Sequence, residues 1–181
     1  MVANFWLRPG NTSSSNNILE FLESTLRHRG NKTIELLCAD NGFFDDAVMK
    51  FLVDKSIAFI ISARWNQPLQ QAIISRCKFW IIEPIWEVGE ISYQAQGWTQ
   101  ARRIVVVRQS IKERAQAPDK TLRLFADDPE VQGWRYGLMV TSLALPSLQI
   151  WRLYRGRGGC ENRIKELNTD FGLDSVNMAE F

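Results

Sequence analysis

The chain has 181 residues, of which 45% are hydrophobic and 23% are charged, and its formal net charge is +2. This length and composition fit one globular domain with a sizeable core, and no apolar run approaches the roughly 20 residues that a membrane-spanning helix needs. His28 is the only histidine, so a Ser-His-Asp or Cys-His catalytic arrangement would have to use it. Cys38, Cys77 and Cys160 are scattered, which argues against a zinc site and favours a reducing compartment.

The first third of the chain alternates predicted strands with predicted helices. Short apolar runs rich in branched residues indicate buried strands, and Ile18, Leu19, Leu22 and Leu26 follow the spacing of an amphipathic helix. The alternation is typical of an α/β layer with parallel strands. The predicted order is a strand over residues 3–11, a helix within 13–30, a strand over 33–40, a helix over 44–56 and a strand over 57–65.

The pattern changes in the middle of the chain. Residues 89–98 alternate apolar and polar side chains, which indicates a strand with one face in the core. Further strands are predicted over 102–109, 121–127 and 134–143, with short connections between them. We therefore expect an antiparallel segment from about Glu83 to Leu143, inserted between α/β elements.

A late helical pattern carries a row of polar and charged residues. Tyr154, Arg157, Glu161 and Lys165 fall on one stripe when the segment is projected at about 100° per residue. The ordinary interpretation is a solvated face, in which Glu161 and Lys165 form an i,i+4 pair. The three glycines within residues 156–159 also argue against an undisturbed helix before Glu161.

Asp40 stands directly after a predicted buried strand. Ligands of open α/β sheets bind at the carboxyl ends of strands, but Asp40 and Asn41 could equally form a turn. Asp40 and Glu161 are far apart in sequence, so only the fold could bring them together. A pair of carboxylates would suit Mg²⁺ or Mn²⁺, which prefer oxygen ligands and can activate water without a histidine.

Two of these stretches resemble signature blocks of a known family. ELLCADNGF and YRGRGGCENRIKEL are similar to blocks of the DDE transposases of bacterial insertion sequences, in which tyrosine, two residues, arginine, three residues and glutamate recur. Tyr154, Arg157 and Glu161 fit that spacing without a gap. LRPGNTSS, RRIVVVRQ and VTSL also look like that group and occur in the same order, so the resemblance covers essentially the whole chain.

The resemblance implies an α/β fold of the ribonuclease-H-like type. The expected architecture is a mixed sheet with flanking helices and a β-rich insertion before the last helix. Residues 1–181 would form a partial catalytic domain. Its parts would be an α/β core over 1–82, the insertion over about 83–143 and, over 144–181, the C-terminal helix that carries the glutamate.

The resemblance also implies metal-dependent cleavage and strand transfer at transposon ends. Asp40 matches the second aspartate of the family's triad and Glu161 matches its glutamate, so both would be catalytic metal ligands. The intact enzyme would hold two Mg²⁺ (or Mn²⁺) ions. Tyr154 and Arg157 would contact a phosphate near the transposon end, Arg157 through both arms of its guanidinium.

The insertion supplies further candidates for contact with DNA. In relatives it provides an aromatic side chain that stacks on an extruded base, and Trp98, close to Arg102 and Arg103, is our candidate. A packing role for Trp98 at the end of a strand is about as well supported. Expected partners are the transposon ends and target DNA, without a membrane. A dimer in the synaptic complex is one arrangement that the resemblance allows, and the expected location is the bacterial cytoplasm, at the nucleoid.

The sequence departs from the family pattern in three places. The lysine that follows the glutamate in many relatives is replaced by Asn168, and Lys165 is the candidate substitute. The family's first aspartate has no counterpart upstream of residues 3–11, and relatives continue beyond Phe181. We therefore expect a domain truncated at both ends, marginal in stability and inactive by itself.

Two other functions remain open from the sequence. The chain could be a non-catalytic, DNA-binding remnant that competes with intact transposase or pairs with it. It could also be an ordinary α/β interaction domain with fortuitous motifs, which would bind no DNA in a salt-dependent way.

Overall fold

The computed structural model of the protein describes residues 17–111, 130–131 and 133–158. Two of the predicted strands, over residues 3–11 and 121–127, lie outside the described residues. The same holds for Glu161, Lys165 and Asn168, so their predicted roles stay predictions.

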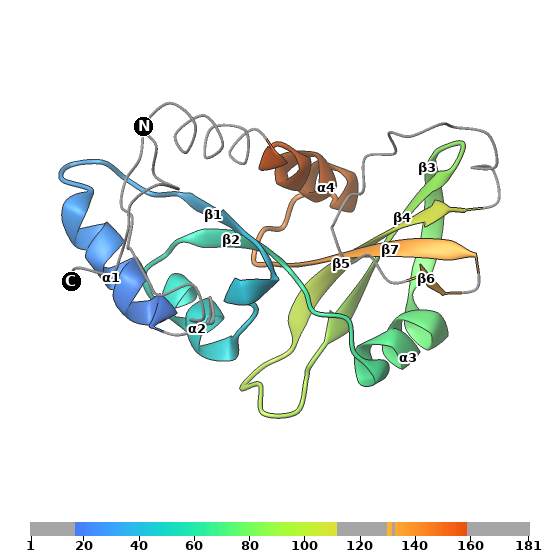
Figure 1. The fold of residues 1–181 in the computed structure, drawn as a ribbon, viewed down its shortest axis with the longest axis horizontal. Helices are drawn as coiled ribbons and strands as arrows, with labels where there is room; N and C mark the ends of the chain where they lie inside the picture. The colour runs from blue at the N-terminus through green and yellow to red at the C-terminus, as the bar shows by residue number, and fades with distance from the viewer. Residues whose placement is uncertain (1–16, 112–129, 132, 159–181) are drawn as a thin grey trace, which may run out of the picture.

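The described chain forms one mixed sheet flanked by helices, which confirms the predicted fold class (Figure 1). The strands follow the order β1-β2-β7-β5-β4-β3, and β6 pairs with β7. The helices are α1 (Ile18–His28), α2 (Asp46–Asp54), α3 (Gln67–Arg76) and α4 (Ser147–Arg155), with a short 3₁₀ turn, η1 (Asn41–Phe43). The strands are β1 (Leu36–Ala39), β2 (Ala58–Ser62), β3 (Lys78–Glu83), β4 (Trp86–Tyr93), β5 (Arg102–Ser110), β6 (Glu130–Val131) and β7 (Trp134–Thr141).

The strands β1 and β2 form the parallel part of the sheet. Leu36 pairs with Ala58 and Ala39 with Ile61, and α2 makes the crossover between the two strands. Asp45 is the N-cap of this helix, because its carboxylate accepts a hydrogen bond from the Ala47 amide at 2.8 Å and so satisfies a donor of the first turn. Predicted strands and helices are thus found where the sequence places them in this part of the chain.

The antiparallel part continues the same sheet. Strand β7 returns to pair with β2, with Ile61 opposite Val140, and β5, β4 and β3 follow outward. The antiparallel strands begin at Lys78, somewhat before the expected boundary near Glu83. Helix α3, which the sequence analysis did not predict, leads into them. Its start has a recognisable signal, because the Asn66 side chain accepts a hydrogen bond from the Leu69 amide and Pro68 lies in the first turn.

Two apolar clusters cover the two faces of the sheet. Phe59 and Ile61 of β2 face a cluster with α1, α2 and α3, whereas Ile60 faces a cluster that contains Trp151 of α4. Figure 1 shows α4 on one side of the sheet and the other three helices on the opposite side. Burial on both faces explains why β2 reads as a continuous apolar run and not as an alternating one.

Within the described residues, β1 is one edge of the sheet and β3 is the other. The predicted strand over residues 3–11 lies outside the described residues, so the expected marginal stability stays a prediction. No helix among the described residues is long and apolar enough to cross a membrane.

Gly89 gives a test of the packing between β3 and β4. A Cβ atom at this position would lie 2.6 Å from both the Cys77 sulfur and the Lys78 carbonyl oxygen. Backbone cannot easily move aside, so we expect Gly89→Ala to lower the free energy of unfolding by about 1–3 kcal/mol. Ser92→Ala, at an exposed position of the same strand, should change it by less than about 0.5 kcal/mol. Urea unfolding measures both, and equal stabilities would contradict this packing.

Candidate functional site at the carboxyl ends of the parallel strands

Asp40 is both a turn residue and an open carboxylate. It follows β1 directly and caps η1, where its Oδ1 accepts a hydrogen bond from the Gly42 amide at 2.9 Å. The side chain nevertheless keeps 53% of its surface exposed. The two interpretations of Asp40 are therefore compatible, because the turn uses Oδ1 and does not use Oδ2.

Tyr154 connects the last turn of α4 to the ends of both parallel strands. Its phenol donates to the Ala39 carbonyl oxygen at 3.3 Å, at the end of β1, and it also hydrogen-bonds to Ser62, at the end of β2. Burial raises the pKa of Tyr154 above its ordinary value of 10.0, although the Arg157 charge and the hydrogen bond to Ser62 oppose the shift. The phenol is thus a fixed, neutral part of the site.

Arg157 lies over Tyr154 and points to Asp40. Its Nη1 donates to the Tyr154 phenol oxygen at 3.3 Å, and its Nη2 is 3.8 Å from the Asp40 Oδ2. Helix α4 has already ended at Arg155, as the glycines predict, and a turn carries Arg157 onward. The Arg157 amide still bonds to the Tyr154 carbonyl at 3.0 Å, so the i,i+3 contact is kept without a continuous helix.

Arg64 is a second cation near the carboxyl ends of the parallel strands, and the sequence analysis missed it. It comes shortly after β2, and its Nε donates to the Asn41 carbonyl oxygen at 3.1 Å, next to Asp40. Arg64 is exposed. The argument used for Asp40 could have found it, because an arginine that follows a buried parallel strand reaches the same edge of the sheet.

Asp40 is the one predicted metal ligand that the described residues place at these strand ends. No group of three or more histidines, cysteines, aspartates or glutamates gathers anywhere in the described ranges. An exposed carboxylate oxygen suits Mg²⁺ or Mn²⁺, but one such ligand does not make a site. The predicted partner Glu161 lies beyond the last described residue, so the structure neither brings it to Asp40 nor separates it.

Trp98 and Arg102 hold the β4–β5 hairpin against the start of α2. The Arg102 guanidinium is buried and forms an ion pair with Asp46 at 2.7 Å. The Trp98 ring meets Phe44 and Tyr93 edge to face, with ring centres 5.4 Å and 6.0 Å apart. These contacts favour the packing role that we weighed for Trp98.

Arg103 fixes the entrance to α4. It pairs with Glu90 and donates to the carbonyl oxygens of Leu143 and Leu145, each at 2.7 Å. Hydrogen bonds from Ser147 and then from Arg103 lower the pKa of Glu90 below its ordinary value of 4.5. Arg103 is thus a positioning residue for the helix that carries Tyr154.

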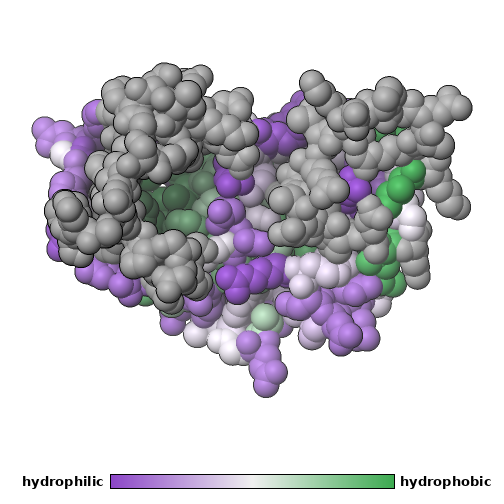
Figure 2. Space-filling view, in the orientation of Figure 1, coloured by the Kyte–Doolittle hydropathy of each residue, from purple (hydrophilic) through white to green (hydrophobic). Residues whose placement is uncertain are grey.

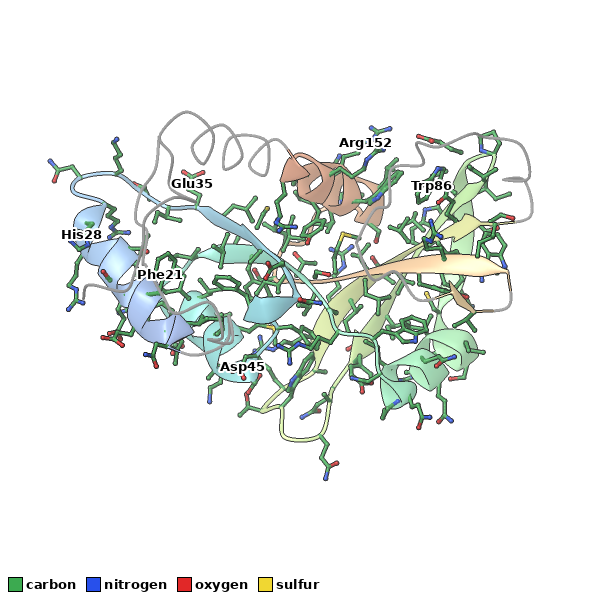
Figure 3. The ribbon with its side chains drawn as sticks, in the orientation of Figure 1. Phe21, His28, Glu35, Asp45, Trp86 and Arg152 are labelled. Carbon is green, nitrogen blue, oxygen red and sulfur yellow. The ribbon has the colours of Figure 1, made fainter. Side chains whose placement is uncertain are left out.

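His28 plays a local role at the end of α1. Its Nδ1 lies 2.8 Å from the Ser24 carbonyl oxygen, one turn earlier in the same helix. Figure 3 shows His28 at the outer end of α1. This agrees with a capping role for the histidine.

Comparison with known proteins gives one family. The family described as transposase DDE domain group 1 matches residues 1–181, which is the whole printed chain. Comparison with curated protein sequences gives no match.

The Asp46–Arg102 pair predicts how stability depends on pH. Burial by itself raises the pKa of Asp46, but hydrogen bonds from Arg102 and Thr99 and the charge of Arg102 bring it below its ordinary value of 3.8. A depressed pKa stabilises the fold above the ordinary value, and this contribution is lost as the pH falls through the depressed one.

We therefore expect Asp46→Asn to lower the free energy of unfolding by about 1–3 kcal/mol at neutral pH and by progressively less below pH 3.8. Asp54→Asn, at the exposed end of α2, is the matched control and should stay within about 0.5 kcal/mol of wild type. Urea unfolding over a pH series measures the difference. A cost of Asp46→Asn that does not shrink in acid would contradict the assignment.

Proposed function

Because the chain belongs to the transposase DDE domain family, we propose that Asp40, Tyr154 and Arg157 form part of a site that cleaves and joins DNA at transposon ends. The family gives this protein a role in DNA transposition, and DNA is its partner. The observation that carries the proposal is the convergence of an open carboxylate, a buried phenol and an oriented guanidinium at one edge of the sheet.

The geometry of Arg157 suits a DNA phosphate. The 3.8 Å separation from the Asp40 oxygen is longer than a charge-assisted hydrogen bond. The Tyr154 phenol accepts a hydrogen bond from the Arg157 guanidinium, which also lies over the phenol ring. This restraint limits the conformational entropy that Arg157 would lose on binding a phosphate through two N–H groups. Arg64 adds a second positive charge beside Asp40.

The family implies a divalent metal ion, and Asp40 provides an oxygen ligand of the right kind for Mg²⁺ or Mn²⁺. We propose Glu161 as a further ligand and Lys165 as a further phosphate contact. Bound ions of this class stabilise the charge of a phosphate that is being cleaved. The roles assigned to this chain's residues are to hold an ion at Asp40 and to place the phosphate beside it through Arg157.

Direct DNA contacts by Trp98, Arg102 and Arg103 receive less support. The Arg102 guanidinium already pairs with Asp46, and the Arg103 guanidinium pairs with Glu90 and donates to backbone carbonyl oxygens. The Trp98 ring packs against two aromatic residues. Their proposed contribution is indirect, since they fix the hairpin and the entrance to α4. Action on chromosomal DNA would place the protein at the bacterial nucleoid.

A second candidate function is a DNA-binding protein without catalysis, which competes with intact transposase or pairs with it. The observation in its favour is that Arg157, held by a hydrogen bond to Tyr154, lies beside Asp40, while no group of three metal-ligating side chains gathers among the described residues. Phosphate binding by Arg157 needs no metal ion. The two candidates therefore predict the same DNA binding and differ in cleavage.

DNA binding of the 181-residue chain tests the phosphate contact. We expect affinity for a labelled fragment of the element's own end to fall as salt rises. Arg157→Ala should weaken binding by about tenfold and reduce the slope against log salt by about one. Arg152→Ala is the matched control, because Arg152 is exposed on the same helix and Figure 3 shows it pointing away from the sheet. Equal affinities of the two variants would refute the contact.

Cleavage with Mg²⁺ or Mn²⁺ separates the two candidate functions. Asp40→Asn is the informative variant, because an asparagine can keep the hydrogen bond to the Gly42 amide while the charge is lost. If the wild type nicks DNA, and Asp40→Asn binds DNA as tightly but does not nick, the catalytic proposal holds. If the wild type binds DNA and never nicks it with either metal, the non-catalytic function is favoured. A chain that binds no DNA would exclude both.

A further inference from the structure

Strand β3 is an exposed edge with an unusually apolar sequence. Its residues are KFWIIE, so four consecutive apolar side chains lie between Lys78 and Glu83. Trp80 is 45% exposed and Ile81 is 72% exposed, on a strand that pairs only with β4 among the described strands. Figure 2 shows hydrophobic surface at the end of the molecule where β3 lies in Figure 1.

Such an edge invites pairing with another strand. Its outer backbone amides and carbonyls form a row of donors and acceptors, and proteins usually protect such edges with charges, proline, β-bulges or a covering element. The register shift of β3 lies at its Glu83 end, after Ile81. The charges of β3 stand at its two ends, and its centre is apolar. The two central side chains, Trp80 and Ile81, point to opposite faces of the sheet, so a covering strand would bury both.

We propose that the partner of this edge is β3 of a second copy of the chain, paired antiparallel about a two-fold axis. A two-fold axis relating two adjacent antiparallel strands must be perpendicular to the sheet, so residues directly opposite each other have the same parity. Pairing centred on Trp80 meets this condition. It places Trp80 opposite the partner's Trp80, and Ile81 opposite the partner's Phe79. Aromatic pairs and pairs of an aromatic with a branched residue are favourable across strands.

The charges at the ends of β3 also match in this arrangement. Trp80 pairs with Val88 of β4, but a register shift after Ile81 brings Glu83 opposite Trp86. Trp86 and Val88 lie on the same face, because they are two residues apart in one strand. Glu83 therefore lies on the same face as Lys78 and Trp80. Reversal of the strand then places Lys78 of each copy beside the partner's Glu83, at both ends of the tryptophan pair.

This match favours a second copy over an unrelated peptide. The same short strand, reversed, supplies an apolar partner for its own centre and an opposite charge for each of its ends. The pairing uses β3, the outer strand opposite to β1, so it does not involve the Asp40 site at the carboxyl end of β1 in either copy. It needs neither DNA nor metal, and its failure would leave the proposed function untouched. A contact of one strand pair is small, so we expect a dissociation constant in the micromolar range.

Sedimentation of the full 181-residue chain without DNA tests the dimer. The wild type should convert from monomer to dimer as its concentration rises through the micromolar range. Ile81→Lys puts a charge into the contact and should raise the dissociation constant by about tenfold or more. Val53→Lys is the matched control, because Val53 is 46% exposed on α2 and should leave the dimer unchanged. A wild type that stays monomeric, or equal dissociation constants for all three proteins, would overturn the proposal.

Cysteine cross-linking tests the register and does not depend on the lysine variant. Trp80→Cys places two thiols directly opposite each other, within reach of a disulfide. Ile81→Cys places them two residues out of step, with Cα atoms on the order of 8 Å apart, which is too far. After mild oxidation, mass spectrometry of the digested proteins should identify a disulfide between copies at the substituted position in Trp80→Cys and none at that position in Ile81→Cys. Equal yields, or a link only in the Ile81→Cys protein, would reject the proposed pairing.

Discussion

The hydrogen bond from the Tyr154 phenol to the Ala39 carbonyl oxygen depends on the docking of α4 over the sheet, and the site depends on that hydrogen bond. Ile150 and Trp151 bury their side chains against Ile60 and the central strands, and this packing fixes the position of α4 on the sheet. Tyr154, one turn later, then reaches the end of β1. Arg157 follows and meets Asp40. The apolar docking of a helix thus decides where a guanidinium and a carboxylate meet.

The antiparallel strands supply most of the sheet surface on which α4 packs. Because β7 pairs with β2, the parallel and antiparallel parts form one sheet, and β2 is buried on both faces. Polar contacts then hold two segments outside the sheet core, the start of α4 and the β4–β5 hairpin. Arg103 holds the entrance to α4 through Glu90 and two backbone carbonyls, and Arg102 holds the β4–β5 hairpin to α2 through Asp46. Neither of these ion pairs involves Asp40.

The two edges of the sheet have different chemistry. Near the β1 edge, strand ends gather one open carboxylate and two cations, which suits phosphate and a hard metal ion. The β3 edge is apolar at its centre and charged at its ends, which suits a strand of its own kind. In a paired sheet of this kind, the Asp40 sites of the two copies would lie on opposite sides of the β3 contact.

The sequence by itself determined the elements that a local pattern of apolar residues marks. It located α1 and α2 from helical spacing, and β1, β2, β5 and β7 from short runs of apolar and branched residues. The glycines indicated the break in the helix at Gly156, and the spacing of Tyr154 and Arg157 placed them on one side of the chain. Only the tertiary structure decided that β7 joins β2, that Tyr154 reaches Ala39, and that Arg102 and Arg103 are held by Asp46 and Glu90. The physical reason is that these contacts join residues far apart along the chain. The sequence pattern gives each residue's local conformation and burial, but a long-range partner is chosen by how the whole sheet packs.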